Sequence, residues 1–323
     1  MTVLITGAAG FIGSHVSQAL LARGERVIGV DNLNDYYDVS LKQARLERLV
    51  RYAGFEFLKA DISDRESMLA IAERSDPIQG IVNLAAQAGV RHSLIDPYIY
   101  IQSNVMGQVV MLELARRLKG LKHFVYASSS SVYGGNTQLP FSTEQPVDRP
   151  NSLYAATKRS DELIGYTYAH LYGIPATGLR FFTVYGPWGR PDMAAFIFTR
   201  AILSGEPISV FNHGEMQRDF TFIDDIVNGV VRALDRPAQG EPPHAVYNLG
   251  NNRSEKLLDF IATLEDALGV AATKRLEPLQ PGDVPATYAD IEASTRDLGF
   301  LPTTPISVGI PKFVAWYREY YGL

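Results

Sequence analysis

The sequence of 323 residues contains no cysteine, and this absence excludes several kinds of chemistry. Disulfide bonds, thiol nucleophiles and cysteine-ligated zinc all need a residue that the chain does not have. The six histidines show no ligand-like spacing such as H-x-x-x-H, so we expect no metal site. No apolar run approaches the roughly 18 residues that a membrane helix needs, and no basic segment opens the sequence. We therefore expect a cytoplasmic protein without a membrane partner.

An excess of positive charge is also lacking. The formal net charge is -5, whereas nucleic-acid-binding proteins usually carry a basic footprint, so we expect no nucleic-acid partner. Any anionic ligand must then be bound by local groups. The hydrophobic fraction of 46% is ordinary for a globular protein, and the length exceeds the size at which one core usually stops growing. We expect two domains of unequal size.

Short apolar segments alternate with helical patterns along the first 180 residues. The strand-like segments are 2–6, 27–30, 55–59, 80–84, 124–127, 176–182 and, much later, 247–249. The helical segments are 11–23, 41–52, 65–75, 99–118 and 153–171. This alternation predicts an α/β fold of the Rossmann type, with a doubly wound parallel sheet.

The composition changes after residue 182 to loops rich in proline, glycine and aromatic residues. From 253 onward, short helical segments are separated by proline-containing loops, which predicts a smaller C-terminal α/β domain for substrate binding. We assign 1–180 plus about 221–250 to the first domain. The second domain takes about 181–220 plus 251–323.

Three glycines, Gly7, Gly10 and Gly13, stand between the first strand and the first helix. Glycine permits a sharp turn and a close approach of the backbone, and the helix N-terminus favours a pyrophosphate. The alternative is a merely tight turn. Because Asp31 ends the next strand, where a carboxylate can accept from ribose hydroxyls and repel a 2'-phosphate, we expect NAD rather than NADP.

Both acidic residues near this site have simpler interpretations. Asp31 could cap the loop that follows it. Asp61 follows the third strand, where it could accept a hydrogen bond from the adenine amine or cap the next helix. The sequence alone leaves both alternatives open.

Tyr154 and Lys158 lie four residues apart, so on a helix they share one face. A phenol with its usual pKa of about 10 is a poor base at neutral pH, and a nearby ammonium favours the phenolate. Four serines, Ser128 to Ser131, follow the fifth strand, where ligands of open sheets bind. The alternatives are an ordinary helix face for the pair and turn-forming or capping roles for the serines.

Together these motifs resemble the extended short-chain dehydrogenase/reductase family, in its nucleotide-sugar epimerase branch. The resemblance rests on TGAAGFIG at 6–13, NLAA at 83–86, the serine run and YAATK at 154–158. It implies Ser129, Tyr154 and Lys158 as catalytic residues. It also implies that NAD is bound by Gly7, Gly10, Phe11, Ile12, Gly13, Asp31, Asn32, Asp61, Ile62, Leu84, Ala85, Ala86, Asn104, Tyr154 and Lys158.

The serine run contains no acidic residue, which related dehydratases and decarboxylases place there for acid–base work on carbon. This absence favours oxidation and reduction at one carbinol, which is a 4-epimerisation. The segment 180–193 and AGVR at 88–91 look most like UDP-glucuronate 4-epimerases. We therefore expect UDP-glucuronate as the substrate and UDP-galacturonate as the product, through a transient 4-keto sugar.

The same resemblance assigns the substrate contacts. Thr183 and Arg190, with Ser129, Ser130 and Ser131, are expected near the sugar, where an arginine fork and hydroxyl donors suit a carboxylate. Phe211, Arg218 and Asp283 are expected at the nucleotide. The alternatives are a solvated loop position for Arg190 and a turn role for Asp283. Relatives carry an arginine where this chain has Gln280, which puts one diphosphate contact in doubt.

Other functions remain open at this point. They are a UDP-glucose or UDP-N-acetylhexosamine 4-epimerase, a sugar-nucleotide 4,6-dehydratase or reductase, and a non-catalytic protein that binds NAD and a UDP-sugar. The long amphipathic segments 99–118 and 153–171 could pair between subunits, so we also expect a homodimer.

Overall fold

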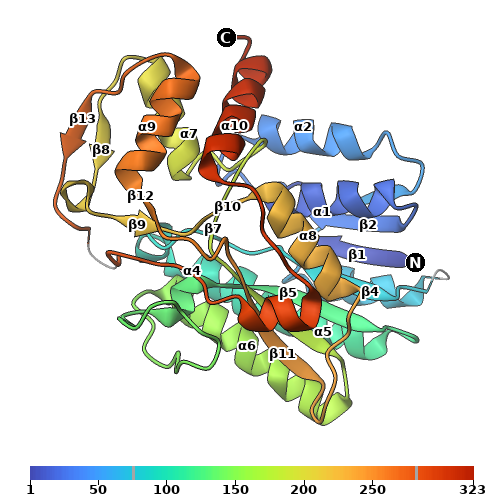
Figure 1. Cartoon of the computed structure of the whole chain (residues 1–323). Helices are drawn as coiled ribbons and strands as arrows, with labels where there is room; N and C mark the ends of the chain where they lie inside the picture. The colour runs from blue at the N-terminus through green and yellow to red at the C-terminus, as the bar shows by residue number, and fades with distance from the viewer. Residues whose placement is uncertain (75–76, 281–282) are drawn as a thin grey trace.

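The computed structural model describes residues 1–74, 77–280 and 283–323, and its centre is a seven-stranded parallel sheet. The strands lie in the order β11-β6-β5-β4-β1-β2-β3 (Figure 1). Their bounds are β1 Thr2–Thr6, β2 Arg26–Asp31, β3 Phe55–Lys59, β4 Gly80–Asn83, β5 His123–Ser129, β6 Ala176–Phe181 and β11 His244–Leu249. This is the Rossmann strand order with one further strand at the edge, so the predicted fold class is confirmed.

Helices cover both faces of this sheet because successive side chains of each strand point to opposite faces. Val3 and Ile5 pack into one core cluster, whereas Leu4 between them packs into the other. The first face is covered by α1 Phe11–Ala22, α2 Val39–Leu49 and α8 Ile223–Leu234. The second face carries α3 Arg65–Ala70, α4 Pro97–Tyr100, α5 Gly107–Arg117 and α6 Leu153–Tyr172. Figure 1 shows the two helical layers on either side of the sheet.

The strand order reverses between β1 and β4, which opens a crevice at the carboxyl ends of these strands. Side chains join the two strand ends there. The Thr6 hydroxyl donates to Asn83 Oδ1 at 2.5 Å, and the Ala85 N–H donates to the Thr6 hydroxyl oxygen at 3.0 Å. The loop after β4 is therefore held directly beside the turn that follows β1.

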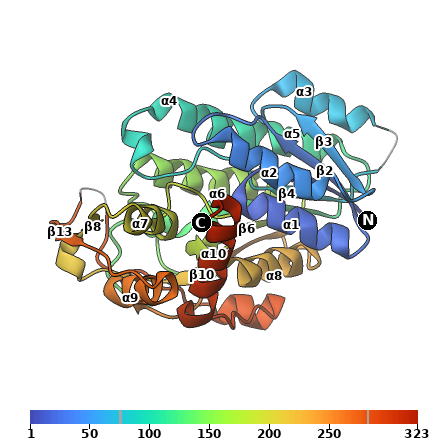
Figure 2. The same cartoon turned by 90° about the horizontal axis from the view of Figure 1, so that it is seen from above.

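The remaining elements form a smaller α/β region beside this crevice (Figure 2). Its elements are β7 Thr183–Tyr185, α7 Ala194–Leu203, β8 Ile208–Val210, β9 Gln217–Arg218, β10 Phe220–Phe222, β12 Glu255–Lys256, α9 Leu257–Leu268, β13 Lys274–Leu276 and α10 Ile306–Tyr321. Three two-stranded sheets pair β7 with β10, β8 with β13 and β9 with β12. One core cluster runs from Val3 and Ile5 of β1 to Phe313 of α10, so both regions share buried apolar contacts. The predicted residue boundaries of the two domains stay a prediction.

The described residues also contain short 3₁₀ and π-helical turns. Four 3₁₀ turns span Ile71–Glu73, His92–Leu94, Ser130–Tyr133 and Asn212–Gly214, and two π-helical turns span Ile101–Met106 and Ser294–Leu298. No helix among the described residues is long and apolar enough to cross a membrane.

Several predicted helix boundaries were wrong. The segment 41–52 is α2, Val39–Leu49, and the segment 65–75 is a short helix, α3, followed by a 3₁₀ turn, with Ser75 outside the described residues. The segment 99–118 is not one α-helix, because the π-helical turn Ile101–Met106 separates α4 from α5. Inserted π turns of this kind are frequently found at functional sites.

Candidate active site

A cavity of about 1040 Å³ follows the carboxyl ends of β1, β4 and β5 and continues into the smaller region. It brings together residues that lie far apart in the sequence. The predicted site residues that line it are Gly7, Gly10, Phe11, Ile12, Gly13, Asp31, Asn32, Asp61, Ile62, Leu84, Ala85, Ala86, Ser129, Ser130, Ser131, Tyr154, Lys158, Thr183, Arg190, Phe211, Arg218 and Asp283. Only Asn104 of the predicted set lies outside this lining. Their individual ligand contacts stay predictions.

The turn between β1 and α1 has no space for side chains at its glycines. A Cβ atom on Gly13 would lie 2.0 Å from the Gly7 carbonyl oxygen, and Gly7 itself has a φ of +68°. Gly10 precedes α1, and no side chain caps this helix. The first backbone N–H groups of α1 thus lie at the cavity wall, where they and the helix dipole favour a pyrophosphate.

Asp31 has the loop-binding role that the sequence left open, and its predicted contact with the ribose stays a prediction. Its Oδ2 accepts from the Ala9 N–H at 3.1 Å, and its Oδ1 accepts from the Leu33 N–H at 2.9 Å. The carboxylate therefore ties the glycine-rich turn to the loop after β2. It also lines the cavity at the end of β2, where a ribose would lie against it.

Asp61 does not cap the following helix, so that alternative was wrong. Asp64 caps α3 by accepting from the Glu66 and Ser67 N–H groups. Asp61 accepts instead from the Asn32 amide at 2.8 Å and from the Ser63 N–H and hydroxyl at 2.8 and 2.7 Å. Asp61 and Asn32 form one polar wall of the cavity.

Asn104 lies behind the cavity and positions its wall. Its side chain accepts from the Gln87 N–H at 2.8 Å and donates to the Gln87 carbonyl at 3.1 Å. A further bond to the Thr157 hydroxyl, at 2.9 Å, reaches α6. Asn104 lies in the π-helical turn. Its bonds link Gln87, which lines the cavity, to α6, the helix of Tyr154 and Lys158.

Tyr154 and Lys158 lie on the first two turns of α6, which begins after Ser152 because the Ser152 hydroxyl caps the Ala155 N–H at 3.1 Å. The Tyr154 ring meets the Tyr100 ring edge to face, with centroids 6.1 Å apart. Lys158 donates to the Ala127 carbonyl at 3.0 Å and to Asp161 Oδ2 at 3.0 Å. The pair therefore has one ring contact and one buried ion pair holding it in place.

The serines of the run after β5 have different surroundings. Ser128 is buried and donates to Glu162 Oε1 at 2.6 Å, so its role is structural. Ser129 accepts from the Ser131 N–H at 3.2 Å and from the Ser131 hydroxyl at 3.0 Å, which leaves its own O–H proton available. Ser129, Ser130 and Ser131 line the same cavity as Tyr154.

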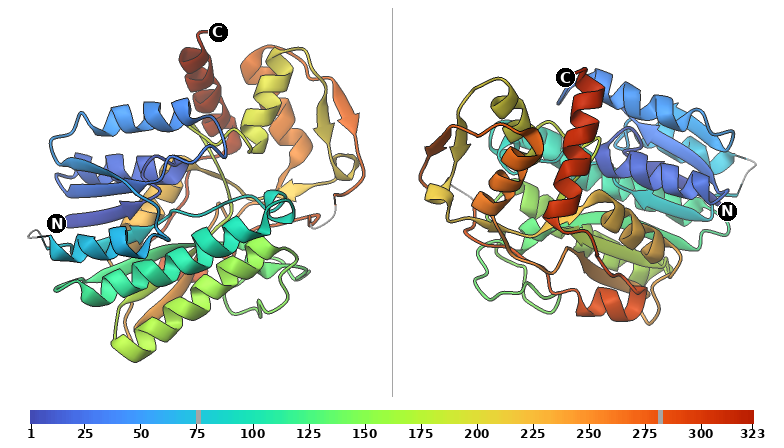
Figure 3. Two further views of the ribbon diagram at one scale, coloured as in Figure 1. Left: turned by 180° about the vertical axis from the view of Figure 1, so that it is seen from behind. Right: turned by 45° about the horizontal axis from the view of Figure 1, so that its top comes forward.

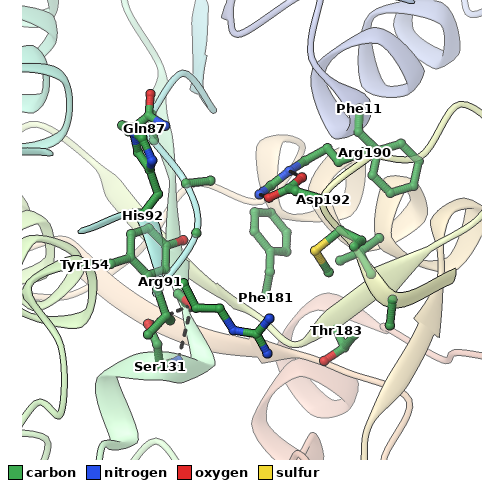
Figure 4. Close-up of a pocket in the computed structure, with 18 of the residues that line it drawn as sticks. Phe11, Gln87, Arg91, His92, Ser131, Tyr154, Phe181, Thr183, Arg190 and Asp192 are labelled. Carbon is green, nitrogen blue, oxygen red and sulfur yellow. Dashed lines mark hydrogen bonds and ion pairs between the residues drawn. The ribbon is translucent and has the colours of Figure 1, made fainter. Parts of the chain in front are cut away.

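Thr183 and Arg190 line the cavity across from Tyr154 and Ser131 (Figure 4). Arg190 bonds to Asp192 through Nε at 3.0 Å and through Nη2 at 2.5 Å. Its side chain is 23% exposed, so Arg190 is not a freely solvated loop residue. The paired Nε and Nη2 leave Nη1 for another acceptor.

At the expected nucleotide end of the cavity, Arg218 and Asp283 form an ion pair that the sequence did not predict. Arg218 donates to Asp283 Oδ1 at 2.6 Å, and burial lowers the pKa of Arg218 although Asp283 opposes that shift. Phe211 lies under the Arg91 guanidinium, which is 5.2 Å from its ring centroid. Pro281 and Gly282, which precede Asp283, lie outside the described residues.

Sequence reasoning missed the buried arginine that links the two halves of the site. Arg45 of α2 donates to the Ala9 carbonyl in the glycine-rich turn and to the Trp188 and Gly189 carbonyls beside Arg190, at 2.7–3.1 Å. No spacing rule singles out an arginine within an amphipathic helix. Its zero exposure is a property of the tertiary fold alone.

Comparison with known proteins agrees with this geometry. The NAD dependent epimerase/dehydratase family matches residues 3–250. This chain belongs to that family. UDP-glucuronate 4-epimerase 4 of Arabidopsis thaliana is 49% identical over 99% of this chain and 76% of its own length.

Two solved structures show the same fold over nearly the whole chain. UDP-glucuronic acid 4-epimerase from Bacillus cereus, in complex with UDP-glucuronic acid and NAD, is 35% identical with a TM-score of 0.91, covering 99% of this chain and 100% of its own. UDP-glucose 4-epimerase from Thermotoga maritima is 31% identical with a TM-score of 0.89, covering 99% and 100%. The recognised family is therefore confirmed. NAD is the family's cofactor, and the side-chain-free cradle at Gly7 and Gly13 fits it.

The described residues hold no group of three histidine, cysteine or acidic side chains that could bind a metal ion.

Proposed function

We propose that this protein interconverts UDP-glucuronate and UDP-galacturonate by NAD-dependent epimerisation at C4. The observation that carries this proposal is the common cavity, where Tyr154 and Lys158 face an acid-free serine run beside a glycine-rich turn. An elimination or a decarboxylation calls for an acid or base acting on carbon. Oxidation and reduction at a single carbinol needs one acid–base group, the tyrosine, together with a hydride acceptor, which the family's NAD supplies.

The proposed chemistry assigns one task to each catalytic side chain. Tyr154 acts as a phenolate, which the nearby Lys158 ammonium on the same helix face favours, and takes the proton of the C4 hydroxyl. Ser129 donates a hydrogen bond from its free O–H to the C4 oxygen and orients it. NAD bound at the glycine-rich turn of Gly7, Gly10 and Gly13 would supply the acceptor for the C4 hydride and, after the sugar has turned over, its donor. Tyr154 then returns the proton, so no cofactor is consumed.

The sugar carboxylate is proposed to be bound by Arg190, Thr183, Ser130 and Ser131. A 4-keto uronate is a β-keto acid, and it loses carbon dioxide when the bond to its carboxylate aligns with the carbonyl π system. The breaking bond leaves its electron pair on the sugar as an enolate. A carboxylate held in one orientation avoids this alignment, and Arg190 Nη1 with short hydroxyl donors suits that task.

Replacing Arg190 by glutamine is expected to raise the ratio of pentose by-product to epimer about tenfold, because a hydrogen bond to a charged group is typically worth about 1.5–3 kcal/mol. Products are read by NMR. The matched control is Arg218→Gln, which removes another aspartate-paired arginine of the cavity and should raise KM without adding pentose. An unchanged product ratio in a turning-over Arg190→Gln enzyme contradicts the assignment of the carboxylate site.

The substrate is tested by incubating the purified protein, without added NAD, with UDP-glucuronate and UDP-glucose separately. We expect turnover of the uronate to exceed that of the neutral sugar. The similarity to a UDP-glucose 4-epimerase makes UDP-glucose the second candidate. Turnover of UDP-glucose alone assigns the protein to that second function.

We also propose a homodimer. Large apolar side chains are exposed along α4, the π-helical turn and α6, which run beside one another (left view of Figure 3). They are Tyr98, Ile101, Met106, Leu163, Tyr166 and Leu171, joined by Leu94 and Ile95 at the end of the 3₁₀ turn that precedes α4. Contiguous exposed apolar side chains are unusual on a monomer surface and often mark a protein–protein interface.

Replacing Leu163 by glutamate is expected to convert the dimer to a monomer, because it introduces a charge into that apolar face. Light scattering after size exclusion measures the mass. Leu301→Glu is the control, since Leu301 is 65% exposed and lies outside the proposed interface. A wild-type protein that is already monomeric contradicts the proposal.

A further inference from the structure

The Lys158 ammonium has a carboxylate partner inside the protein, and the proposed chemistry gives that carboxylate no task. Asp161 lies one helical turn after Lys158 on α6, with Oδ2 3.0 Å from the Lys158 Nζ. The two side chains are 5% and 3% exposed. Within the described part of the chain, the one other hydrogen bond of this ammonium goes to the Ala127 carbonyl at 3.0 Å. Lys158 is thus directly ion-paired with Asp161.

Burying the ionised Asp161 carboxylate lowers the stability of the fold. Its second oxygen, Oδ1, is buried and has no hydrogen-bond partner among the described residues. Burial raises the pKa of Asp161 to about 6, although Lys158 opposes that shift. Because the folded pKa lies above its ordinary value, ionisation of Asp161 reduces stability as the pH rises through about 6. Stability alone therefore gives no reason for a carboxylate at this position.

The other charged groups around the pair are already matched or neutral. On α6 itself, Glu162 is bound by Arg180 of β6 and by Arg159. Tyr126 of β5 bonds to His244 of β11. Other titratable groups on neighbouring elements are Tyr133 of the 3₁₀ turn after β5, bonded to Arg180 and Asn248, Tyr100 of α4, bonded to the Ala88 and Gly89 carbonyls, His92, whose ring lies tilted against that of Tyr36, and Glu113 of α5, paired with Arg116. Asp161 is the carboxylate left to Lys158.

We propose that Asp161 is a positioning residue that keeps the Lys158 ammonium protonated and directed at the Ala127 carbonyl during turnover. This inference rests on the proposed function. A buried ammonium loses its proton readily, and a neighbouring oxidised nicotinamide carries a like charge that increases this tendency. An opposite charge in direct contact offsets both effects.

Removing the carboxylate should narrow the pH range of activity. In Asp161→Asn, Lys158 loses its proton at lower pH, so the alkaline limb of the kcat/KM profile should move down by about one unit. Activity on that limb should fall about tenfold relative to wild type, whereas activity near neutral pH should fall less. Asp161→Ser removes the same charge with a smaller side chain and should show the same shift. Asp161→Glu should restore part of the profile.

The control is Asp235→Asn, which removes an equal charge from an exposed ion pair with Arg23 and should leave the profile unchanged. Thermal midpoints of all variants are measured alongside, and those of Asp161→Asn and Asp161→Ser should not fall far below wild type. A profile that coincides with wild type, or one lowered equally at every pH, overturns the proposal.

A second measurement needs no turnover. The chain has eight lysines, so ¹³Cε-labelled lysine gives few NMR signals, and Lys158→Met identifies the signal of Lys158. Its titration midpoint should be about one unit lower in Asp161→Asn than in wild type. An unmoved midpoint in an enzyme that epimerises refutes only the proposed role of Asp161 and leaves the proposed function standing. A moved midpoint in a protein that epimerises no UDP-sugar refutes the proposed function and leaves the ion pairing intact.

Discussion

Replacing Tyr154 by phenylalanine is expected to lower kcat for epimerisation about a thousandfold, because a positioned acid–base group contributes about 10²–10⁴ in rate. The substitution removes the hydroxyl and keeps the ring, which packs against Tyr100. Binding of NAD and of UDP-glucuronate should therefore change little. NMR of the products gives kcat, and calorimetry gives the affinity for the sugar nucleotide.

Tyr166→Phe is the control for this variant. It makes the same chemical change on the same helix, α6, at a residue that is 49% exposed and lies outside the cavity lining. We expect its kcat to equal that of wild type. A Tyr154→Phe enzyme that retains wild-type kcat contradicts the assignment of Tyr154 as the proton acceptor.

Replacing Arg180 by methionine is expected to lower the free energy of unfolding by about 3–5 kcal/mol, because it leaves a buried carboxylate without its main partner. Arg180 of β6 binds both oxygens of Glu162 at 2.8 and 2.9 Å. Glu162 also accepts from Ser128, the residue before Ser129. The loss should therefore loosen the serine run as well as the fold. Denaturant titration measures the change.

Arg159→Met is the matched control, since Arg159 binds the same Glu162 carboxylate at 2.8 Å from a position that is 32% exposed. Partly exposed ion pairs typically contribute about 0–1 kcal/mol, so this variant should stay close to wild type. Equal losses in the two arginine variants contradict the view that burial makes the Arg180 pair important.

The part of the site that depends on local sequence was predictable. Glycines between a strand and a helix permit the sharp turn and close backbone approach that a pyrophosphate needs, and the helix period alone places Tyr154 and Lys158 on one face. The parallel sheet followed from the alternation of apolar and helical segments. These features need no knowledge of distant contacts.

The rest depends on tertiary contacts that no spacing rule gives. The pairing of Arg190 with Asp192 can be guessed from proximity, but the pairing of Arg218 with Asp283 joins residues 65 positions apart. Strands such as β9 and β12 have two residues each, too short for a period to appear. Asn104 in the π-helical turn bonds to Gln87 and Thr157, which lie 17 and 53 positions away in the sequence. The cytoplasmic location and the domain boundaries stay predictions.

The most direct test of the central claim follows the hydrogen at C4. UDP-glucuronate deuterated at C4 is incubated in ordinary water with the purified protein, without added NAD, and the product is examined by NMR and mass spectrometry. If the hydride is held within the active site, UDP-galacturonate forms with its C4 deuterium retained. Loss of that deuterium to water during epimerisation contradicts a mechanism in which Tyr154 and Lys158 serve a transient oxidation at C4.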